Sequence, residues 1–314
     1  MANFQTASNR PGAFSCPEEP RPEGKPSWLK VKLPTRSDYF LTANLLKKGR
    51  LHTICQSAKC PNISECWSAR TATFLILGDI CTRRCAFCAV KKGTPSQPSA
   101  EEPLRVAEAV VAMELDYAVI TSVTRDDLAD GGSSLFSQTV GEIKARRPQT
   151  RVEVLIPDFQ GDEKALAAVV RSGPDVLNHN IETTASCYPL ISRPAQNYGR
   201  SLALLKKAKE MGALTKSGLM VGLGESADSI EETLGDLKSA GCSLLTVGQY
   251  LRPGRDNLPI ARYYAPREFE EIKRRALAMG FEGVESGPLV RSSYQAGRMF
   301  AARQKGGVAS PCAT

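Results

Sequence analysis

Short apolar runs alternate with amphipathic segments through the middle of this 314-residue chain. The apolar runs have the length of buried strands, and strands are expected at 73–77, 117–121, 151–156, 175–178, 215–221 and 243–247. Between and after them, apolar residues recur at the helical period, which predicts helices over 104–113, 135–146, 164–171, 202–211, 230–239 and 269–279. Regular strand-helix alternation is typical of a parallel sheet with right-handed crossovers.

Six such units predict an α/β fold, a partial (β/α)6 TIM-like barrel, and the pattern alone leaves an open doubly wound sheet as the alternative. In both architectures the functional site lies at the carboxyl ends of the strands. Three residues separate the first strand from Cys81, so the loop that begins there belongs to that face. Four predicted helices are followed by a glycine that can close a helix in the left-handed conformation: Gly173, Gly212, Gly241 and Gly280.

The barrel is expected to occupy residues 71–285, between an N-terminal extension at 28–70 and a C-terminal segment at 286–300. Residues 1–27 are proline-rich with little apolar content, so they are expected to be mobile. The Gly- and Ala-rich tail at 301–314 is expected to be mobile for the same reason.

The formal net charge of +8 favours an acidic partner through long-range attraction, with a generally basic solvated surface as the alternative. Basic residues are spread along the chain without a zinc-finger or RNP pattern, so no nucleic-acid partner is expected. The chain has no apolar stretch of membrane-spanning length and no signal-peptide pattern. We therefore expect a cytoplasmic protein that does not bind membranes.

Six of the ten cysteines form two triplets, Cys55, Cys60 and Cys66, and Cys81, Cys85 and Cys88. Ligand-like spacing in a chain without an export signal indicates reduced thiolates. Iron-sulfur clusters usually take four cysteines, so a triplet leaves one iron free to bind another molecule, whereas a structural zinc site would need a fourth ligand. The other cysteines are expected to be buried or incidental thiols: Cys16, Cys187, Cys242 and Cys312.

The segment from Cys81 to Cys88, with Phe87 before the last cysteine, resembles the cluster loop of the radical S-adenosylmethionine (SAM) superfamily. The resemblance implies that Cys81, Cys85 and Cys88 hold a [4Fe-4S] cluster whose open iron binds SAM. It also implies that an electron from the cluster cleaves SAM to a 5'-deoxyadenosyl radical, which removes hydrogen from an unactivated carbon.

The first triplet has gaps of four and five residues, and Arg291-Ser292-Ser293-Tyr294 lies near the C-terminus. Together these features resemble the lipoyl synthases, and the similarity covers nearly all of residues 28–300. It implies a second, auxiliary [4Fe-4S] cluster that supplies sulfur and is consumed in turnover. Its ligands in the resemblance would be Cys55, Cys60, Cys66 and Ser293.

The resemblance implies a radical SAM sulfurtransferase that inserts sulfur at C6 and C8 of protein-bound N6-octanoyl-lysine. Expected partners are octanoylated lipoyl carrier domains, such as 2-oxoacid dehydrogenase E2 subunits and the glycine cleavage H protein. A reductant such as flavodoxin or ferredoxin and an iron-sulfur carrier that rebuilds the auxiliary cluster would also be needed. Two alternatives stay open: a radical SAM sulfur-inserting enzyme that acts on a small molecule, and a non-catalytic iron-sulfur binding or delivery protein.

Polar residues after the second and fourth predicted strands are candidates for SAM or substrate contacts, with helix caps and surface ion pairs as the alternatives. These candidates are Thr124, Arg125, Asp126, Asn178, Glu182 and Arg193. The chain also departs from the family pattern at Cys187 and at Asn257, where family members commonly carry histidine. Both departures are expected to lie in loops away from the cluster ligands and to bear on carrier preference.

Overall fold

A computed structural model describes residues 24–31 and 37–306 of the chain. One eight-stranded sheet has the order β1-β2-β5-β6-β7-β8-β9-β10, and all its neighbouring strands are parallel except β1 and β2. The strands are β1 (His52–Thr53), β2 (Thr73–Ile76), β5 (Tyr117–Ser122), β6 (Arg151–Leu155), β7 (Val176–Asn178), β8 (Thr215–Val221), β9 (Leu244–Gln249) and β10 (Gly283–Gly287). Two short parallel strands, β3 (Ile80–Cys81) and β4 (Lys91–Lys92), form a separate pair.

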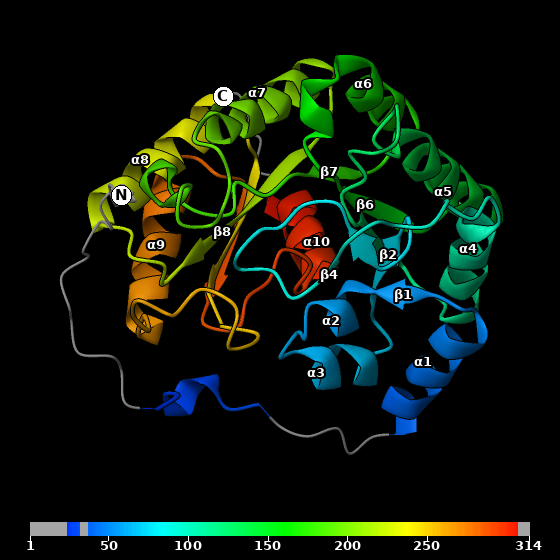
Figure 1. Ribbon diagram of the computed structural model, residues 1–314, viewed down its shortest axis with the longest axis horizontal. Coiled ribbons are helices and arrows are strands. Elements are labelled where there is room, and N and C mark those ends of the chain that lie inside the picture. Colours follow the sequence, from blue (N-terminus) through cyan, green and yellow to red (C-terminus); the bar gives the residue numbers. More distant parts are fainter. Residues whose placement is uncertain (1–23, 32–36, 307–314) are drawn as a thin grey trace, which may run out of the picture.

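Helices form an arc outside the curved sheet, which gives the partial barrel predicted from the sequence (Figure 1). The barrel helices are α4 (Glu102–Ala112), α5 (Ser133–Arg146), α6 (Glu163–Arg171), α7 (Gln196–Glu210), α8 (Ala227–Ser239) and α9 (Pro266–Ala278). Three helices precede the barrel: α1 (Ser37–Lys48), α2 (Ile54–Ser57) and α3 (Ile63–Ser68). The chain also forms α10 (Ala296–Gly306) and three 3-10 turns, η1 (Ser27–Leu29), η2 (Phe159–Gly161) and η3 (Ala185–Cys187).

The six predicted strands and six predicted helices are all present, and the helices begin earlier than their apolar periodicity indicates. At α6 and α8, a polar residue before the helix satisfies free backbone N–H groups of the first turn. Asp162 accepts hydrogen bonds from the backbone N–H groups of Lys164 and Ala165, and Ser226 forms a capping box with Ser229. The predicted helix-closing glycines all have positive φ angles, between +75° and +91°.

Strand β10 was not predicted, because its sequence Gly283–Gly287 contains a single aliphatic side chain. It extends the sheet beyond the six predicted strands by pairing in parallel with β9, and it crosses the expected barrel boundary at residue 285. Helix α10 runs to Gly306, so residues 301–306 of the tail that is expected to be mobile are helical. The other residues expected to be mobile include 1–23 and 307–314, which lie outside the described part of the chain.

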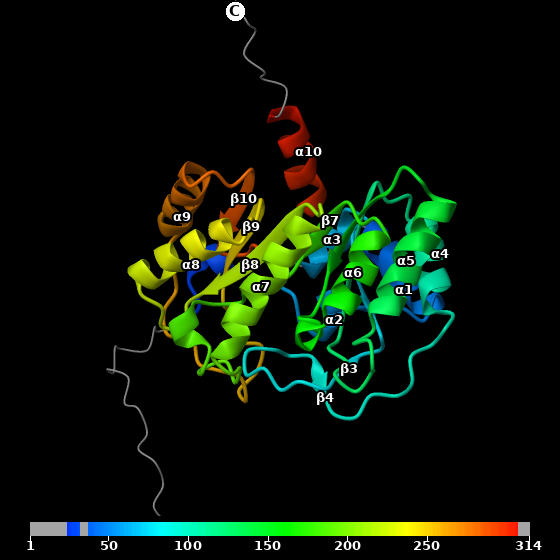
Figure 2. The same ribbon diagram turned by 90° about the horizontal axis from the view of Figure 1, so that it is seen from above.

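Helix α10 and the cysteine-bearing pair β3-β4 lie at opposite ends of the barrel (Figure 2). Met299 and Phe300 of α10 pack against Val176 and Leu244, at the amino ends of β7 and β9. The opposite end, where the strands end in polar residues and loops, is therefore the end that holds the site. Among the described residues, no helix combines the length and apolar character needed to cross a bilayer.

Candidate active site

A cavity of about 460 Å³ lies at the carboxyl ends of the barrel strands. Residues from both cysteine triplets reach its wall, including Cys55, Cys60 and Cys88. Apolar side chains cover another part of the wall: Leu155, Leu219, Met220, Tyr250 and Val290. A largely apolar cavity of this size with a few polar groups suits a small-molecule or side-chain ligand.

The second triplet lies in the loop that follows β2, and its sulfur atoms face hydrogen-bond donors. The backbone N–H of Arg83 donates to Cys81 Sγ at 3.4 Å, and Arg193 Nε donates to Cys85 Sγ at 3.4 Å. Burial raises the pKa of the Cys88 thiol to about 11. Burial thus disfavours the free thiolate at Cys88, while the N–H donors at Cys81 and Cys85 are placed to stabilise sulfur ligands of a cluster.

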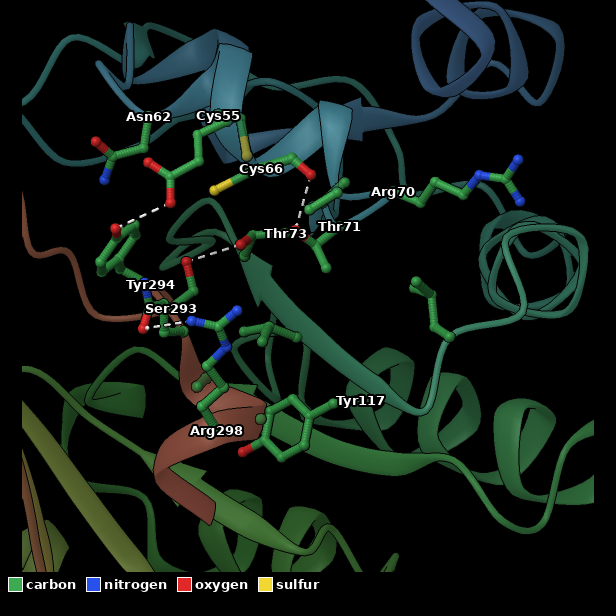
Figure 3. A pocket seen from close by; sticks show the side chains of 18 of the residues that line it. Cys55, Asn62, Cys66, Arg70, Thr71, Thr73, Tyr117, Ser293, Tyr294 and Arg298 are labelled. Carbon is green, nitrogen blue, oxygen red and sulfur yellow. Dashed lines mark hydrogen bonds between the residues drawn. The ribbon is translucent and has the colours of Figure 1, made fainter. Parts of the chain in front are cut away.

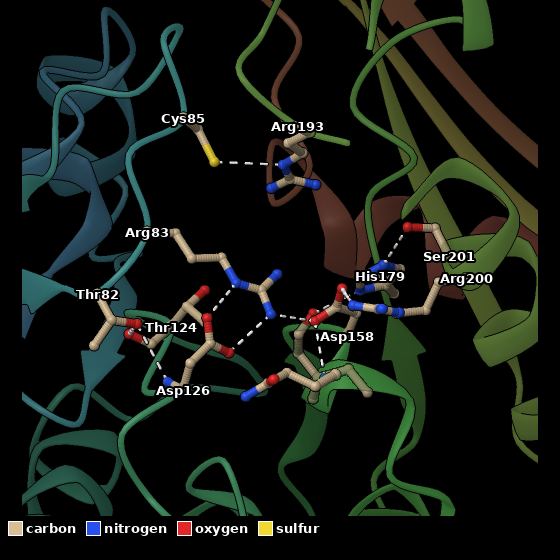
Figure 4. A network of polar contacts seen from close by, with 12 residues as sticks. Thr82, Arg83, Cys85, Thr124, Asp126, Asp158, His179, Arg193, Arg200 and Ser201 are labelled. Carbon is tan, nitrogen blue, oxygen red and sulfur yellow. Dashed lines mark hydrogen bonds and ion pairs between the residues drawn. The ribbon is translucent and has the colours of Figure 1, made fainter. Parts of the chain in front are cut away.

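Ion pairs fix the cluster loop against the barrel (Figure 4). The Arg83 guanidinium donates to Asp126 at 2.7 and 2.8 Å and also to Asp158, which receives a longer contact from Arg200 at 3.4 Å. Burial raises the pKa of Asp158, but the hydrogen bond and charge of Arg83 outweigh burial and lower it to about 2. Arg83 is thus held by two carboxylates at the strand ends.

Arg193 and Glu182 present opposite charges beside the second triplet. Arg193 Nη2 lies 3.6 Å from Glu182 Oε1, and its guanidinium carbon lies 5.7 Å from the centroid of the Phe87 ring. Burial raises the pKa of Glu182, and the charge of Arg193 only partly opposes this. These two side chains can bind complementary charged groups of a ligand near Cys85.

The first triplet lines an adjoining cavity of about 570 Å³ together with Ser293 (Figure 3). Helices α2 and α3 carry Cys55 and Cys66, while Cys60 lies in the loop between them. The Thr73 hydroxyl, at the start of β2, donates to Ser293 Oγ at 2.8 Å. The C-terminal segment therefore reaches the same cavity as the N-terminal cysteines.

Two further hydrogen bonds tie the C-terminal segment to the N-terminal extension. Asn62 Nδ2 donates to the Leu289 carbonyl at 2.7 Å, and the Tyr294 hydroxyl donates to Glu65 Oε1 at 3.0 Å. Each bond joins residues more than 200 positions apart in the sequence. The cavity of the first triplet is consequently built from both ends of the described chain.

Burial raises the pKa of all three thiols in the first triplet, to about 12 for Cys66, where Cys55 and Cys60 add to the shift. The positive charge of Arg291 opposes part of the rise in the pKa of Cys60. Within the described residues, no three His, Cys, Asp or Glu side chains converge on a single metal-ion position.

Comparison with known proteins identifies the family. Residues 75–237 match the model of the Radical SAM superfamily. Lipoyl synthase from Rubrobacter xylanophilus is 54% identical over 275 residues, covering 87% of this chain and 85% of that protein. Lipoyl synthase from Caldicellulosiruptor saccharolyticus is 53% identical over 274 residues, covering 87% of this chain and 96% of that protein. The chain belongs to the lipoyl synthases.

Membership in the lipoyl synthases makes this chain a radical SAM sulfurtransferase, and the superfamily implies a [4Fe-4S] cluster and SAM. Solved structures with low sequence identity share the fold. The maturase HydG of [FeFe]-hydrogenase aligns with a TM-score of 0.54 at 14% identity, covering 79% of this chain and 63% of that chain. Methylornithine synthase (PylB) aligns with a TM-score of 0.51 at 13% identity, covering 80% of this chain and 75% of that chain. The predicted barrel is confirmed.

The polar residues predicted to contact SAM or substrate occupy three different settings in this lipoyl synthase family member. Glu182 lines the central cavity, and Arg193 contacts Cys85. Thr124 and Asp126 line a separate cavity of about 400 Å³, although both also contact the cluster loop.

Arg125 and Asn178 are placed in packed positions instead. Arg125 is 1% exposed, pairs with Asp127 and donates to the Leu77 carbonyl. Asn178 is fully buried and donates to Glu153 Oε1 at 2.9 Å. Arg125 is thus paired within the protein, whereas the buried Oδ1 atom of Asn178 has no hydrogen-bond partner among the described residues.

The expectation that Asn257 lies away from the cluster ligands is wrong. Its side-chain amide donates to the carbonyl oxygens of Ala86 and Cys88 at 3.0 and 3.1 Å. The backbone N–H of Leu258 also donates to the Ala86 carbonyl, at 3.3 Å. The loop after β9 thus supports the cluster loop from a distance of about 170 residues in sequence, which spacing along the chain does not reveal.

The cysteines outside the triplets agree with their predicted role where they are described. Cys187 and Cys242 are 3% and 0% exposed. Cys16 and Cys312 lie outside the described residues. Sequence reasoning also missed Thr73 and Asn180, whose contacts with the C-terminal segment arise only in the folded chain.

Proposed function

We propose that this chain inserts sulfur atoms at C6 and C8 of a protein-bound N6-octanoyl-lysine to give the lipoyl group. The observation that carries this proposal is the meeting of both cysteine triplets at one central cavity, with Ser293 also on its wall. A carbon activated beside the second triplet would then lie within reach of sulfur held by the first. Proximity of this kind replaces a bimolecular encounter with a local transfer.

Cys81, Cys85 and Cys88 would hold the [4Fe-4S] cluster to which SAM binds. When bound, this cluster and SAM supply a 5'-deoxyadenosyl radical able to remove hydrogen from an unactivated carbon. Arg193 and Glu182 lie beside Cys85 and would bind the carboxylate and amino groups of SAM through charge complementarity. Arg83, Asp126 and Asp158 would keep the loop in position during the reaction.

Cys55, Cys60, Cys66 and Ser293 would hold an auxiliary [4Fe-4S] cluster, which serves as the sulfur-donating substrate. A serine oxygen is a harder ligand than a thiolate and is more readily protonated, so it suits a cluster that must be dismantled. Thr73 would orient the Ser293 hydroxyl through the hydrogen bond between them. An iron-sulfur carrier would then be needed to rebuild the cluster.

The apolar part of the cavity wall would bind the octanoyl chain and exclude water. Lys25, Lys59 and Arg252 also line this cavity, and the whole chain carries a net charge of +8. Such charge would attract acidic lipoyl carrier domains, including 2-oxoacid dehydrogenase E2 subunits and the glycine cleavage H protein. A flavodoxin or ferredoxin is the proposed reductant.

An anaerobic reaction tests the proposal with reconstituted protein, SAM, dithionite and a peptide carrying octanoyl-lysine. Mass spectrometry should detect thiolated peptide and 5'-deoxyadenosine, at about one lipoyl group per chain or less. Deoxyadenosine without thiolated peptide would indicate another substrate, and neither product from a fully clustered protein would favour an iron-sulfur binding protein. Cys85→Ala should abolish both products, while Cys242→Ala, a buried cysteine outside both triplets, should retain them.

A further inference from the structure

The adjacent serines of the C-terminal segment form hydrogen bonds in different directions. Ser293 Oγ accepts from Thr73 beside the first triplet. Ser292 Oγ donates to Asn180 Oδ1 at 2.8 Å, in the central cavity between β7 and β8. The backbone at Ser292 and Ser293 is therefore held both beside the first triplet and in the central cavity.

Gly218 of β8 leaves the room that the Ser292–Asn180 hydrogen bond needs. A Cβ atom at this position would lie 2.6 Å from Asn180 Oδ1 and 2.7 Å from Ser292 Oγ. Side chains cannot approach a Cβ this closely, so any other residue at 218 would displace one of the bonded atoms. The absence of a side chain at Gly218 is therefore what allows this hydrogen bond beside β8.

Asn180 also connects Ser292 to the second triplet. Asn180 lies two residues before Glu182, and both line the central cavity. The backbone of Glu182 is fixed on β8 by hydrogen bonds of 3.0 Å to the Gly218 carbonyl and 2.7 Å from the Met220 N–H. Glu182 in turn pairs with Arg193, which donates to Cys85. Ser292 is therefore linked to Cys85 through Asn180, through Glu182 on the same cavity wall, and through Arg193.

We propose that the Ser292–Asn180 hydrogen bond is a latch that sets the position of the C-terminal segment, and that Ser292 is a positioning residue for Ser293. A ligand that binds Glu182 and Arg193 restrains the segment that also carries Asn180 and thereby strengthens the latch. Ser293 then stays against the first triplet while chemistry begins at the second. This inference rests on the proposed roles of Ser293 and Glu182.

Hydrogen exchange of the reconstituted protein tests the latch without relying on turnover. Amides in 288–295 should exchange about two- to tenfold faster in Ser292→Ala, since one hydrogen bond contributes a free energy in that range. Asn180→Ala should have the same effect, and the double variant should exchange no faster than the faster single variant, because both remove one bond. Adding SAM should slow exchange in the unmodified protein and not in Ser292→Ala. Ser239→Ala, at an exposed serine of α8, is the matched control.

Unchanged exchange over 288–295 in Ser292→Ala, or additive effects in the double variant, would overturn the latch. Failure of the proposed function has a different signature. If Ser293→Ala loses iron from the first triplet to a chelator no faster than the unmodified protein, then Ser293 is not a ligand, whatever the exchange data show. The two results can be obtained independently on the same preparations.

Discussion

The Thr73 hydroxyl donates a 2.8 Å hydrogen bond to the Ser293 hydroxyl. Thr73 begins β2, and Ser293 precedes α10, so this bond closes the cavity of the first triplet between the barrel and the C-terminal segment. The position of the serine oxygen in the cavity of Cys55, Cys60 and Cys66 consequently depends on a residue outside the proposed ligand set.

Thr73→Val removes this hydroxyl and keeps the side-chain shape. We expect the first triplet to retain iron about two- to tenfold less well, because the variant loses one hydrogen bond that orients Ser293. Iron and sulfide per chain, measured after exposure to a chelator, check this. Thr94→Val, at an exposed loop position, is the control, and equal retention in both variants would contradict the proposed role of Thr73.

Cys60→Ala distinguishes the proposed role of the first triplet in sulfur donation from that of the second triplet in SAM cleavage. This variant should still form 5'-deoxyadenosine, because Cys81, Cys85 and Cys88 are untouched, but it should give no thiolated peptide. Mass spectrometry of both products in one reaction provides the measurement. Thiolated peptide from Cys60→Ala would mean that the first triplet is not the source of sulfur.

Asn257→Ala removes two hydrogen bonds from the cluster loop, to the carbonyls of Ala86 and Cys88. We expect the rate of SAM cleavage to fall about tenfold to thirtyfold, since the two bonds together contribute roughly 1.4 to 2 kcal/mol to the loop's position. Iron bound by the first triplet should not change. Asn257→His introduces the residue that the family commonly carries and should preserve the rate, so equal losses in both variants would argue against a positioning role.

Asp158 should make stability depend on acid pH. Its folded pKa of about 2 lies below the ordinary value of 3.8, so the ionised carboxylate stabilises the fold by about 2 kcal/mol above pH 4. This contribution is lost as the pH falls from about 4 to about 2. Asp158→Asn should therefore lower the thermal unfolding midpoint at pH 6, and the difference from the unmodified protein should shrink at pH 3. A constant difference across this range would exclude the ionised Asp158–Arg83 pair as its cause.

Gly218→Ala should disturb the C-terminal segment from within the barrel. The added methyl group would meet Asn180 and Ser292, so amides in 288–295 should exchange faster and sulfur insertion should fall. Gly235→Ala, in α8, adds a methyl group with no atom within 4 Å and is the matched control. If both variants behave alike, the space at Gly218 is not important for the segment.

Local pattern predicted most of the fold because the information lies in neighbouring residues. Apolar content predicts strand β6, and the helical period of its apolar residues predicts helix α8. The cysteine spacings identify two candidate ligand sets. Strand β10 could not be recognised, because its pairing with β9 supplies what its own composition lacks. Polar residues at strand ends were harder to assign, since Asn178 and Glu182 look alike in sequence while only Glu182 reaches the cavity. Asn257 shows the same limit, because its partners lie far away along the chain.

The hydrogen bonds that join Asn62, Thr73 and Glu65 to the C-terminal segment have a consequence for biosynthesis. A ribosome delivers the cysteines of the first triplet long before residues 289–294, and chains of this kind fold from their N-terminal side during synthesis. The cavity of the first triplet can be enclosed only after residue 294 has been made. A chain that stops before residue 289 would keep the three cysteines and lack the segment that closes their cavity, so we expect the proposed cluster to be installed there only after that segment has been made.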